Sequence, residues 1–366
     1  MSKKTILASG QESGQPSDLP CHPQSMTTDF LAQALNAPSG SLQQIDFSPI
    51  GTGQVADSYR LQLIWNGFDG PTSVVAKCSA GDKTSRETAH NLHLYEIETS
   101  WYAQAATSVG VRVPHPHYVA FDAASGDFVL LLEDCAPAKQ IDQMLGVQPE
   151  DVAAALTEAA HLHRFRWGDP QLGEIAWLNY GQNNKDYVKN LLPAIAPEFL
   201  ARYRTRLAPE ILDLTRDFVA HYEAYAAAPA KPPPLALTHG DFRLDNMLYR
   251  DGAGRVVILD WQTVSASAPM FDVAYCIATS LADPKIRAQM EEKLLADYLA
   301  QLNLPAGAYA FETAWHDYRH AAFAGLLMAL VSSMVVKRTP RGDEMFAVMA
   351  ERSAWQALHL DSLSLC

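Results

Sequence analysis

The sequence carries little positive charge. It has 28 Lys and Arg residues against 41 Asp and Glu residues, which gives a formal net charge of −13 at pH 7, and it contains no basic run. Proteins that bind nucleic acids or anionic membranes cluster Lys and Arg, because these side chains displace counterions and contact phosphates. We therefore expect neither a nucleic acid nor a membrane among the partners of this protein.

Cysteine is scarce and poorly spaced for cross-linking. The chain has five cysteines, and none of them lies in a Cys-x-x-Cys pair. An odd and scattered set argues against a disulfide framework and against a zinc site. We therefore expect a reduced protein of the cytoplasm.

Long hydrophobic runs are also missing. Only Ile6, Leu7 and Ala8 follow the lysines near the N-terminus, which is too few for the apolar core of a signal peptide. The strongest membrane candidate, residues 321–336, is about sixteen residues long and contains Gly325 and two serines, whereas a membrane span needs roughly 20 apolar residues. We predict that this stretch is a buried helix of the larger lobe.

The first residues of the chain have little that could form a core. Residues 1–26 are rich in Gly, Ser, Pro and Gln, a composition that buries too little apolar surface to order itself, so we predict a flexible extension. The whole chain has 366 residues, of which 48% are hydrophobic and 19% charged. Such a chain can bury a large core, and its size predicts about two domains or lobes.

The sequence also lacks a Walker A motif, so a P-loop NTPase is not supported. Instead, Gly51 and Gly53 lie between two predicted strands, residues 45–50 and 55–65. Glycines in such a turn let backbone amides approach the phosphates of a ligand. An ordinary hairpin turn is the alternative interpretation.

A second hairpin is predicted in the later part of the chain. Two short apolar runs, residues 247–249 and 256–259, flank the turn-forming residues 251–254. Antiparallel pairing of these runs brings Asn246, at the start of the first strand, beside Asp260, at the end of the second.

These two side chains and one nearby carboxylate form a coherent chemical set. Two hard oxygen ligands, Asn246 and Asp260, suit Mg²⁺, which takes its remaining ligands from phosphates and water. Asp241 precedes the hairpin and can accept a hydroxyl proton. A base and a metal site of this kind are the parts that phosphoryl transfer requires. Taken singly, Asp241 could instead cap a turn and Asp260 could simply end a strand.

The same residues resemble a known family. His239-Gly240-Asp241 with Asn246, followed by Asp260-Trp261-Gln262, is similar to the catalytic loop and metal-binding segment of the aminoglycoside phosphotransferase and choline kinase superfamily. Within this superfamily the sequence most resembles the ecdysteroid-kinase-like (CHK-kinase-like) branch. The resemblance implies that Asp241 is the general base and that Asn246 and Asp260 bind Mg²⁺.

Lys77 ends the predicted strand of residues 73–77, and it resembles the lysine that contacts the α- and β-phosphates in this superfamily. A surface lysine at a strand end is the alternative. A helix predicted over residues 87–106 carries Glu98 at the edge of its apolar stripe, where a carboxylate needs a partner. The resemblance implies that Glu98 pairs with Lys77, with Glu87 and Glu96 as rival candidates.

Residues Glu133 and Cys135 follow a predicted buried strand, residues 128–132, and resemble the segment that joins the two lobes in this superfamily. There the backbone groups bind the adenine ring, so the resemblance implies cofactor contacts through the main chain of both residues.

We therefore predict an α+β, bilobal protein-kinase-like fold, with a small antiparallel-sheet N-lobe and a larger, mostly helical C-lobe. The predicted boundaries are an extension over residues 1–26, a nucleotide-binding N-lobe over 27–134, and a catalytic and acceptor-binding C-lobe over 135–366. The resemblance implies a phosphotransferase that moves the γ-phosphoryl group of ATP, with Mg²⁺, to a hydroxyl group of a small molecule.

Two absences bear on the acceptor. No glycine follows Asp260-Trp261-Gln262, and no Ala-Pro-Glu motif occurs after it, so a regulated activation loop is not expected. A small-molecule alcohol is therefore favoured over a protein substrate. A protein kinase and a non-catalytic nucleotide-binding protein are the alternatives. The sequence leaves open the acceptor, the choice between ATP and GTP, and the oligomeric state.

Overall fold

The computed structural model describes residues 6–8, 19–51, 55–180, 184–227, 232–249 and 251–366. The chain forms two compact units. The N-terminal unit contains Met1–Ser108, Val113–Ala136 and Asp260–Gln262. The C-terminal unit contains Val109–Arg112, Pro137–Leu259 and Thr263–Cys366.

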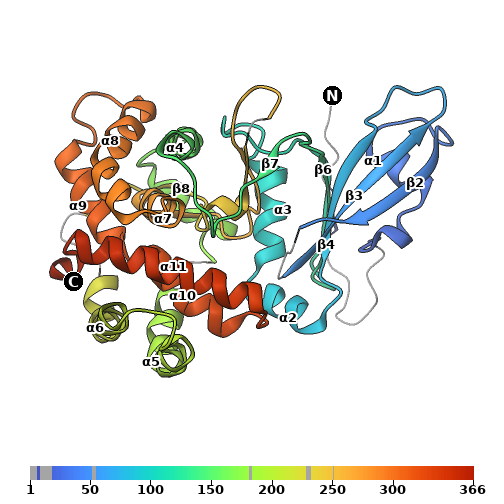
Figure 1. The fold of residues 1–366 in the computed structure, drawn as a ribbon. Coiled ribbons are helices and arrows are strands. Elements are labelled where there is room, and N and C mark those ends of the chain that lie inside the picture. Colours follow the sequence, from blue (N-terminus) through green and yellow to red (C-terminus); the bar gives the residue numbers. More distant parts are fainter. Residues whose placement is uncertain (1–5, 9–18, 52–54, 181–183, 228–231, 250) are drawn as a thin grey trace. The chain divides into compact units, whose positions relative to one another are not determined.

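A six-stranded sheet forms the centre of the N-terminal unit, in the order β1-β5-β6-β4-β3-β2 (Figure 1). All neighbouring strands pair antiparallel except β1 and β5, which are parallel. In β4 half-buried and buried residues alternate over most of the strand, which is the period of two expected for a strand. The strands are β1 (Ile6–Ala8), β2 (Leu42–Pro49), β3 (Ala56–Trp65), β4 (Ser73–Ser79), β5 (Pro116–Asp122) and β6 (Asp127–Glu133).

Three helices accompany this sheet: α1 (Thr28–Ala34), α2 (Lys83–Asn91) and α3 (Leu94–Gln104). The prediction of one continuous helix over residues 87–106 is wrong. His93 has φ 57°, in the left-handed region, where an L-residue interrupts a right-handed helix. The chain therefore ends α2 before this residue and starts α3 directly after it.

The prediction of a flexible extension over residues 1–26 is wrong for its last part. Pro23–Ser25 form a turn of 3₁₀-helix, and Met26 is only 4% exposed. Leu19 and Cys21 also pack against the core that α1 forms with the sheet. These apolar side chains supply the burial that the average composition of the segment does not reveal.

The C-terminal unit is mostly helical, and small sheets carry its loops. A three-stranded sheet has the order β10-β9-β7, and a two-stranded sheet pairs β11 with β8. The helices are α4 (Pro149–His163), α5 (Asn184–Tyr203), α6 (Pro209–Ala226), α7 (Met270–Ser280), α8 (Pro284–Leu302), α9 (Phe311–Ala321), α10 (Ala324–Val335) and α11 (Pro340–His359). The strands are β7 (Lys139–Gln140), β8 (Ala236–Thr238), β9 (Met247–Tyr249), β10 (Val257–Ile258) and β11 (Ser265–Ser267).

The predicted later hairpin is confirmed. β9 and β10 pair antiparallel, with Leu248 opposite Val257 and Met247 opposite Ile258. The predicted combination of an antiparallel sheet in the N-terminal part and a helical C-terminal part is confirmed as well.

Among the described residues, one stretch, Phe311–Val335, has the length and mean hydropathy (1.3) of a membrane span. The structure divides this stretch into α9 and α10, and α10 lies against α11 and α5 (Figure 1). It buries Gly325, Leu326, Ala329 and Leu330, as a core helix does, so the predicted buried helix is confirmed.

Candidate active site

In the N-terminal unit, Lys77 joins two carboxylates. Lys77 lies on the central strand β4, and its Nζ atom is 2.7 Å and 2.8 Å from the two carboxylate oxygens of Glu98 on α3. The same Nζ atom is 2.7 Å from Oδ1 of Asp260. The predicted contact between Lys77 and Glu98 is therefore confirmed, and Glu98 is more deeply buried than expected, with 1% of its surface exposed.

Lys77 and its two carboxylate partners shift one another's pKa values. Burial by itself lowers the pKa of Lys77, but the carboxylates of Asp260 and Glu98 outweigh that effect and raise it. Burial raises the pKa of Glu98, and the nearby ammonium group opposes this shift without cancelling it. The Lys77 ammonium therefore remains charged at neutral pH, in a fixed position where it can bind an anion.

Asp260 is held in place by its neighbour in the sequence. The indole ring of Trp261 stacks on that of Trp101 in α3, with ring centroids 3.9 Å apart and planes inclined by 10°. Both indoles are fully buried. Asp260 itself has φ 63°, an unfavourable conformation for a non-glycine residue. The stack thus anchors a short strained segment and fixes the direction of the Asp260 carboxylate.

In the C-terminal unit, Asp272 holds the loop that carries Asp241. Asp272 is 1% exposed and lies in the first turn of α7. Its carboxylate accepts hydrogen bonds from the backbone N–H of His239 at 2.6 Å and of Gly240 at 2.9 Å. The buried imidazole of His163 lies 3.1 Å from the same carboxylate. Asp272 thus fixes the loop backbone.

Gly240 is required at the centre of this loop. It has φ 83°, and a Cβ atom added there would lie 2.6 Å from the carbonyl oxygen of Thr263. The Thr263 hydroxyl in turn donates to the carbonyl oxygen of His239 at 2.8 Å. The chain after Trp261 therefore packs directly on the loop, and only glycine fits at position 240.

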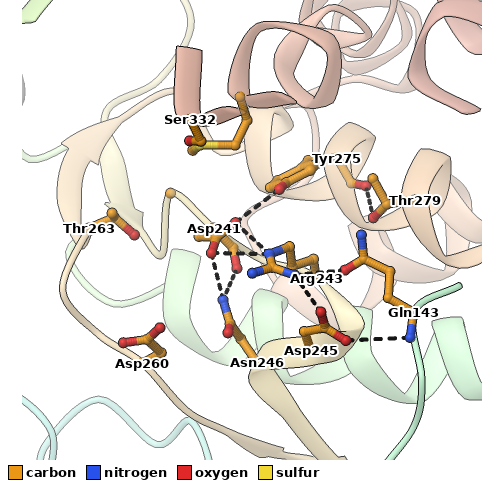
Figure 2. Close-up of polar contacts among 12 residues, drawn as sticks. Gln143, Asp241, Arg243, Asp245, Asn246, Asp260, Thr263, Tyr275, Thr279 and Ser332 are labelled. Atoms are coloured by element: carbon orange, nitrogen blue, oxygen red, sulfur yellow. Dashed lines mark hydrogen bonds and ion pairs between the residues drawn. The ribbon is translucent and has the colours of Figure 1, made fainter. Parts of the chain in front are cut away.

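Three side chains donate hydrogen bonds to the Asp241 carboxylate (Figure 2). Oδ1 accepts from the Tyr275 hydroxyl at 2.9 Å and from Nε of Arg243 at 3.0 Å. Oδ2 accepts from Nδ2 of Asn246 at 2.8 Å and from the same Arg243 nitrogen at 3.1 Å. The carboxylate is thereby held in one orientation.

These donors also set the charge of Asp241. Burial by itself raises the pKa of Asp241, but the charges of Arg243 and His239, with hydrogen bonds from Tyr275 and Asn246, outweigh it and lower the pKa below its ordinary value of 3.8. Asp241 is therefore ionised at neutral pH. It suits the task of orienting a hydroxyl group and accepting its proton late in a reaction.

Asn246 has the chemistry of a magnesium ligand. Its Nδ2 donates to both the backbone and the side chain of Asp241, so its Oδ1 is the atom left to bind a metal ion. The carbonyl oxygen of Asn246 accepts from the N–H of Leu259, and Asp260 follows directly in the chain. Among the described residues no group of three or more His, Cys, Asp or Glu side chains forms a metal site. An amide oxygen fits Mg²⁺, which prefers oxygen ligands and needs few of them from the protein.

The remaining predicted site residues are Gly51, Gly53, Glu133 and Cys135. Gly51 is exposed with φ 71°, and Gly53 lies outside the described residues. Glu133 ends β6 and lies opposite Val74 on β4; its backbone N–H donates to the carbonyl oxygen of His115. Cys135 is buried. Their nucleotide contacts stay predictions.

Arg243, Tyr275 and Trp261 also contribute to the site, in roles that were not predicted from the sequence. Arg243 also binds Asp245 at 2.9 Å and Gln143 at 3.1 Å, which fixes its guanidinium group beside Asp241. The position of Arg243 in the sequence could have indicated its role, because it lies two residues after the candidate base.

Residues 60–311 match the sequence profile of the phosphotransferase enzyme family (APH). The chain belongs to this family. The match includes the loop of Asp241, the hairpin and Lys77, so these elements of the phosphotransferase lie in the region that defines the family. Among curated protein sequences, none matches the chain.

Solved structures with a similar fold include several kinases. A Ralstonia eutropha protein assigned to the aminoglycoside phosphotransferases has 16% identity and a TM-score of 0.53, over 92% of this chain and 96% of that one. Plasmodium vivax ethanolamine kinase has 11% identity and a TM-score of 0.50, over 85% of this chain and 82% of that one. The GDP complex of an aminoglycoside 2′-phosphotransferase-IIIa variant has 15% identity and a TM-score of 0.50, over 92% and 96%. These similarities show that the chain shares the fold of these three proteins.

Proposed function

We propose that the protein transfers the γ-phosphoryl group of ATP to a hydroxyl group of a small molecule, with Mg²⁺. The observation that carries this proposal is the bond between Asn246 and the ionised Asp241 carboxylate, within the region that matches the family. A half-buried base beside an amide ligand is the arrangement that phosphoryl transfer to an alcohol needs.

In this mechanism Asp241 orients the acceptor hydroxyl and accepts its proton as the new phosphorus–oxygen bond forms. The bond between the γ-phosphorus and the β-phosphate oxygen breaks, giving ADP and a phosphate monoester. Lys77, fixed by Glu98, binds the α- and β-phosphates. Asn246 and Asp260 would hold Mg²⁺, which neutralises charge on the phosphates when bound.

Further parts of the proposal rest on the sequence. The resemblance of His239-Gly240-Asp241 and Asp260-Trp261-Gln262 supports a place in the ecdysteroid-kinase-like branch. The Gly51 turn and the main chain at Glu133 and Cys135 are proposed as nucleotide contacts. The net charge of −13 and the scattered cysteines support a cytoplasmic enzyme without nucleic acid or membrane partners.

The test is transfer of γ-labelled phosphate from Mg-ATP into a fractionated extract of the native host. We expect label in a small-molecule fraction with the unmutated protein and none with the Asp241→Asn variant. Mg-ATP affinity should remain nearly unchanged in that variant, because Asp241 is not assigned to the nucleotide. Label in polypeptides would instead indicate a protein kinase, and unchanged turnover in Asp241→Asn would remove Asp241 from the role of base.

A second variant tests the metal assignment. Asp260→Ala should weaken the magnesium-dependent part of nucleotide binding, measured by titration calorimetry with and without Mg²⁺. Equal affinity for Mg-ATP in this variant and the unmutated protein would contradict the assignment of Asp260 as a ligand.

A further inference from the structure

Helix α10 passes very close to the side chains around Asp241. A Cβ atom added at Gly325 would lie 3.0 Å from Cδ2 of Tyr275, whose hydroxyl is bound to Asp241. The absence of a side chain at position 325 therefore brings the helix against the ring of Tyr275. The side of α10 that carries Gly325 therefore faces the tyrosine that binds the proposed base.

That side of α10 carries a thioether and a hydroxyl group. Gly325, Met328 and Ser332 are spaced by three and four residues, so they lie along one face of the helix. Met328 and Ser332 are half-buried, and the Ser332 hydroxyl is 3.1 Å from the Met328 sulfur. In Figure 2 Ser332 lies on the side of α10 that faces Tyr275 and Asp241. From α11, the sulfur of Met345 lies 3.4 Å from Nη1 of Arg243.

The carboxylates near this face are already paired. Helix α10 contains no charged residue at all. The acidic residues of α11 and of the Asp241 loop each have an arginine partner within 3.1 Å. These pairs are Asp343 with Arg338, Glu344 and Glu351 with Arg206, and Asp241 and Asp245 with Arg243. A polycationic acceptor would have to compete with these arginines for its counter-charges.

We propose that the phosphate acceptor is an uncharged alcohol with an apolar body, which packs on the thioethers of Met328 and Met345. This inference rests on the proposed function and assigns its substrate class. Methionine side chains are flexible and polarisable, so they fit apolar ligands of varied shape. The Ser332 hydroxyl offers one polar contact, and the reacting hydroxyl of the ligand lies at Asp241.

The size of the effect follows from the burial of methylene groups. Each buried CH₂ contributes about 0.8 kcal/mol, which is about a fourfold gain in affinity per methylene. The experiment is calorimetric titration of the full-length protein, saturated with Mg-ADP, by a series of straight-chain primary alcohols of increasing length. An aminoglycoside polycation is titrated in parallel. We expect affinity to rise about fourfold per methylene until the face is covered, and the aminoglycoside to bind more weakly than the longest alcohol.

Two matched variants locate the binding face. Met328→Gln should reduce the gain per methylene while Mg-ADP affinity stays unchanged. Met334→Gln makes the same substitution on the same helix, at another half-buried methionine that lies about 120° around the axis. This control should leave the series as in the unmutated protein.

Three results would overturn the inference: an affinity that does not depend on chain length, tighter binding of the aminoglycoside, or equal effects of the two methionine variants. Failure of the protein to bind Mg-ADP is a separate result. It would count against the proposed function itself, so the two failures can be distinguished.

Discussion

Removing the hydroxyl group of Tyr275 tests how the proposed base is controlled. Tyr275 is 2% exposed, and its hydroxyl donates to Oδ1 of Asp241 at 2.9 Å. The variant Tyr275→Phe removes this single donor and keeps the ring that packs beside Gly325. Arg243 and Asn246 continue to hold the carboxylate, so the geometry of the site should persist.

The expected magnitude follows from this one bond. A hydrogen bond to a charged group contributes about 1.5–3 kcal/mol, and one pKa unit corresponds to about 1.36 kcal/mol. Tyr275→Phe should therefore destabilise the ionised form of Asp241 by about 1.5 kcal/mol, at the lower end of that range because Arg243 shares the same oxygen, and the pKa of Asp241 should rise. Asp241 has a lowered pKa in the folded protein, so its contribution to stability is present above its unfolded pKa and is lost as pH falls through the folded pKa. In Tyr275→Phe this loss should be smaller and should end at a higher pH, because the folded pKa of Asp241 then lies closer to its unfolded pKa.

The assay is a carbon-13 NMR titration of the aspartate carboxyl groups, with the Asp241 signal assigned by its absence in Asp241→Asn. Tyr225→Phe is the control, because the Tyr225 hydroxyl is buried without a hydrogen-bond partner among the described residues. An Asp241 pKa that is the same in Tyr275→Phe and in the unmutated protein would refute the reasoning, provided that both are folded.

Two further substitutions test the supports of the site. Lys77→Met leaves Glu98 buried without its cation, so Glu98 should bind a proton. The variant should therefore lose stability as pH rises above the unfolded pKa of Glu98. The double variant Lys77→Met/Glu98→Gln should remove that pH dependence in thermal unfolding. Gly240→Ala forces a Cβ atom against the Thr263 carbonyl at positive φ and should lower the free energy of unfolding by about 1–3 kcal/mol in denaturant titration. Gly252→Ala is the control and should be nearly neutral, because a Cβ atom there meets no neighbour. Equal costs in the two variants would contradict the packing argument.

The reacting groups could be predicted from the sequence because their geometry is local. Asn246 follows Asp241 by five residues, and the hairpin that leads to Asp260 is encoded by two short apolar runs around a turn. The pairing of Lys77 with Glu98 also follows from a strand and a helix that are close in the chain.

The supports of these groups could not be predicted in the same way. Tyr275 lies 34 residues after Asp241, and its hydroxyl reaches the carboxylate only because α7 packs beside the loop. The stack of Trp261 on Trp101 depends on tertiary packing between segments that are far apart in the chain. The helix break at His93 likewise has no glycine or proline to mark it.

The tryptophan stack has a consequence for any attempt to separate the two units. Asp260–Gln262 belongs to the N-terminal unit although the chain on both sides of it belongs to the other unit. A fragment that ends at Ala136 would therefore lack the ring that covers Trp101, and this large apolar surface would become exposed to water. Such a fragment should self-associate or be degraded, so the two parts should be expressed and engineered as one chain.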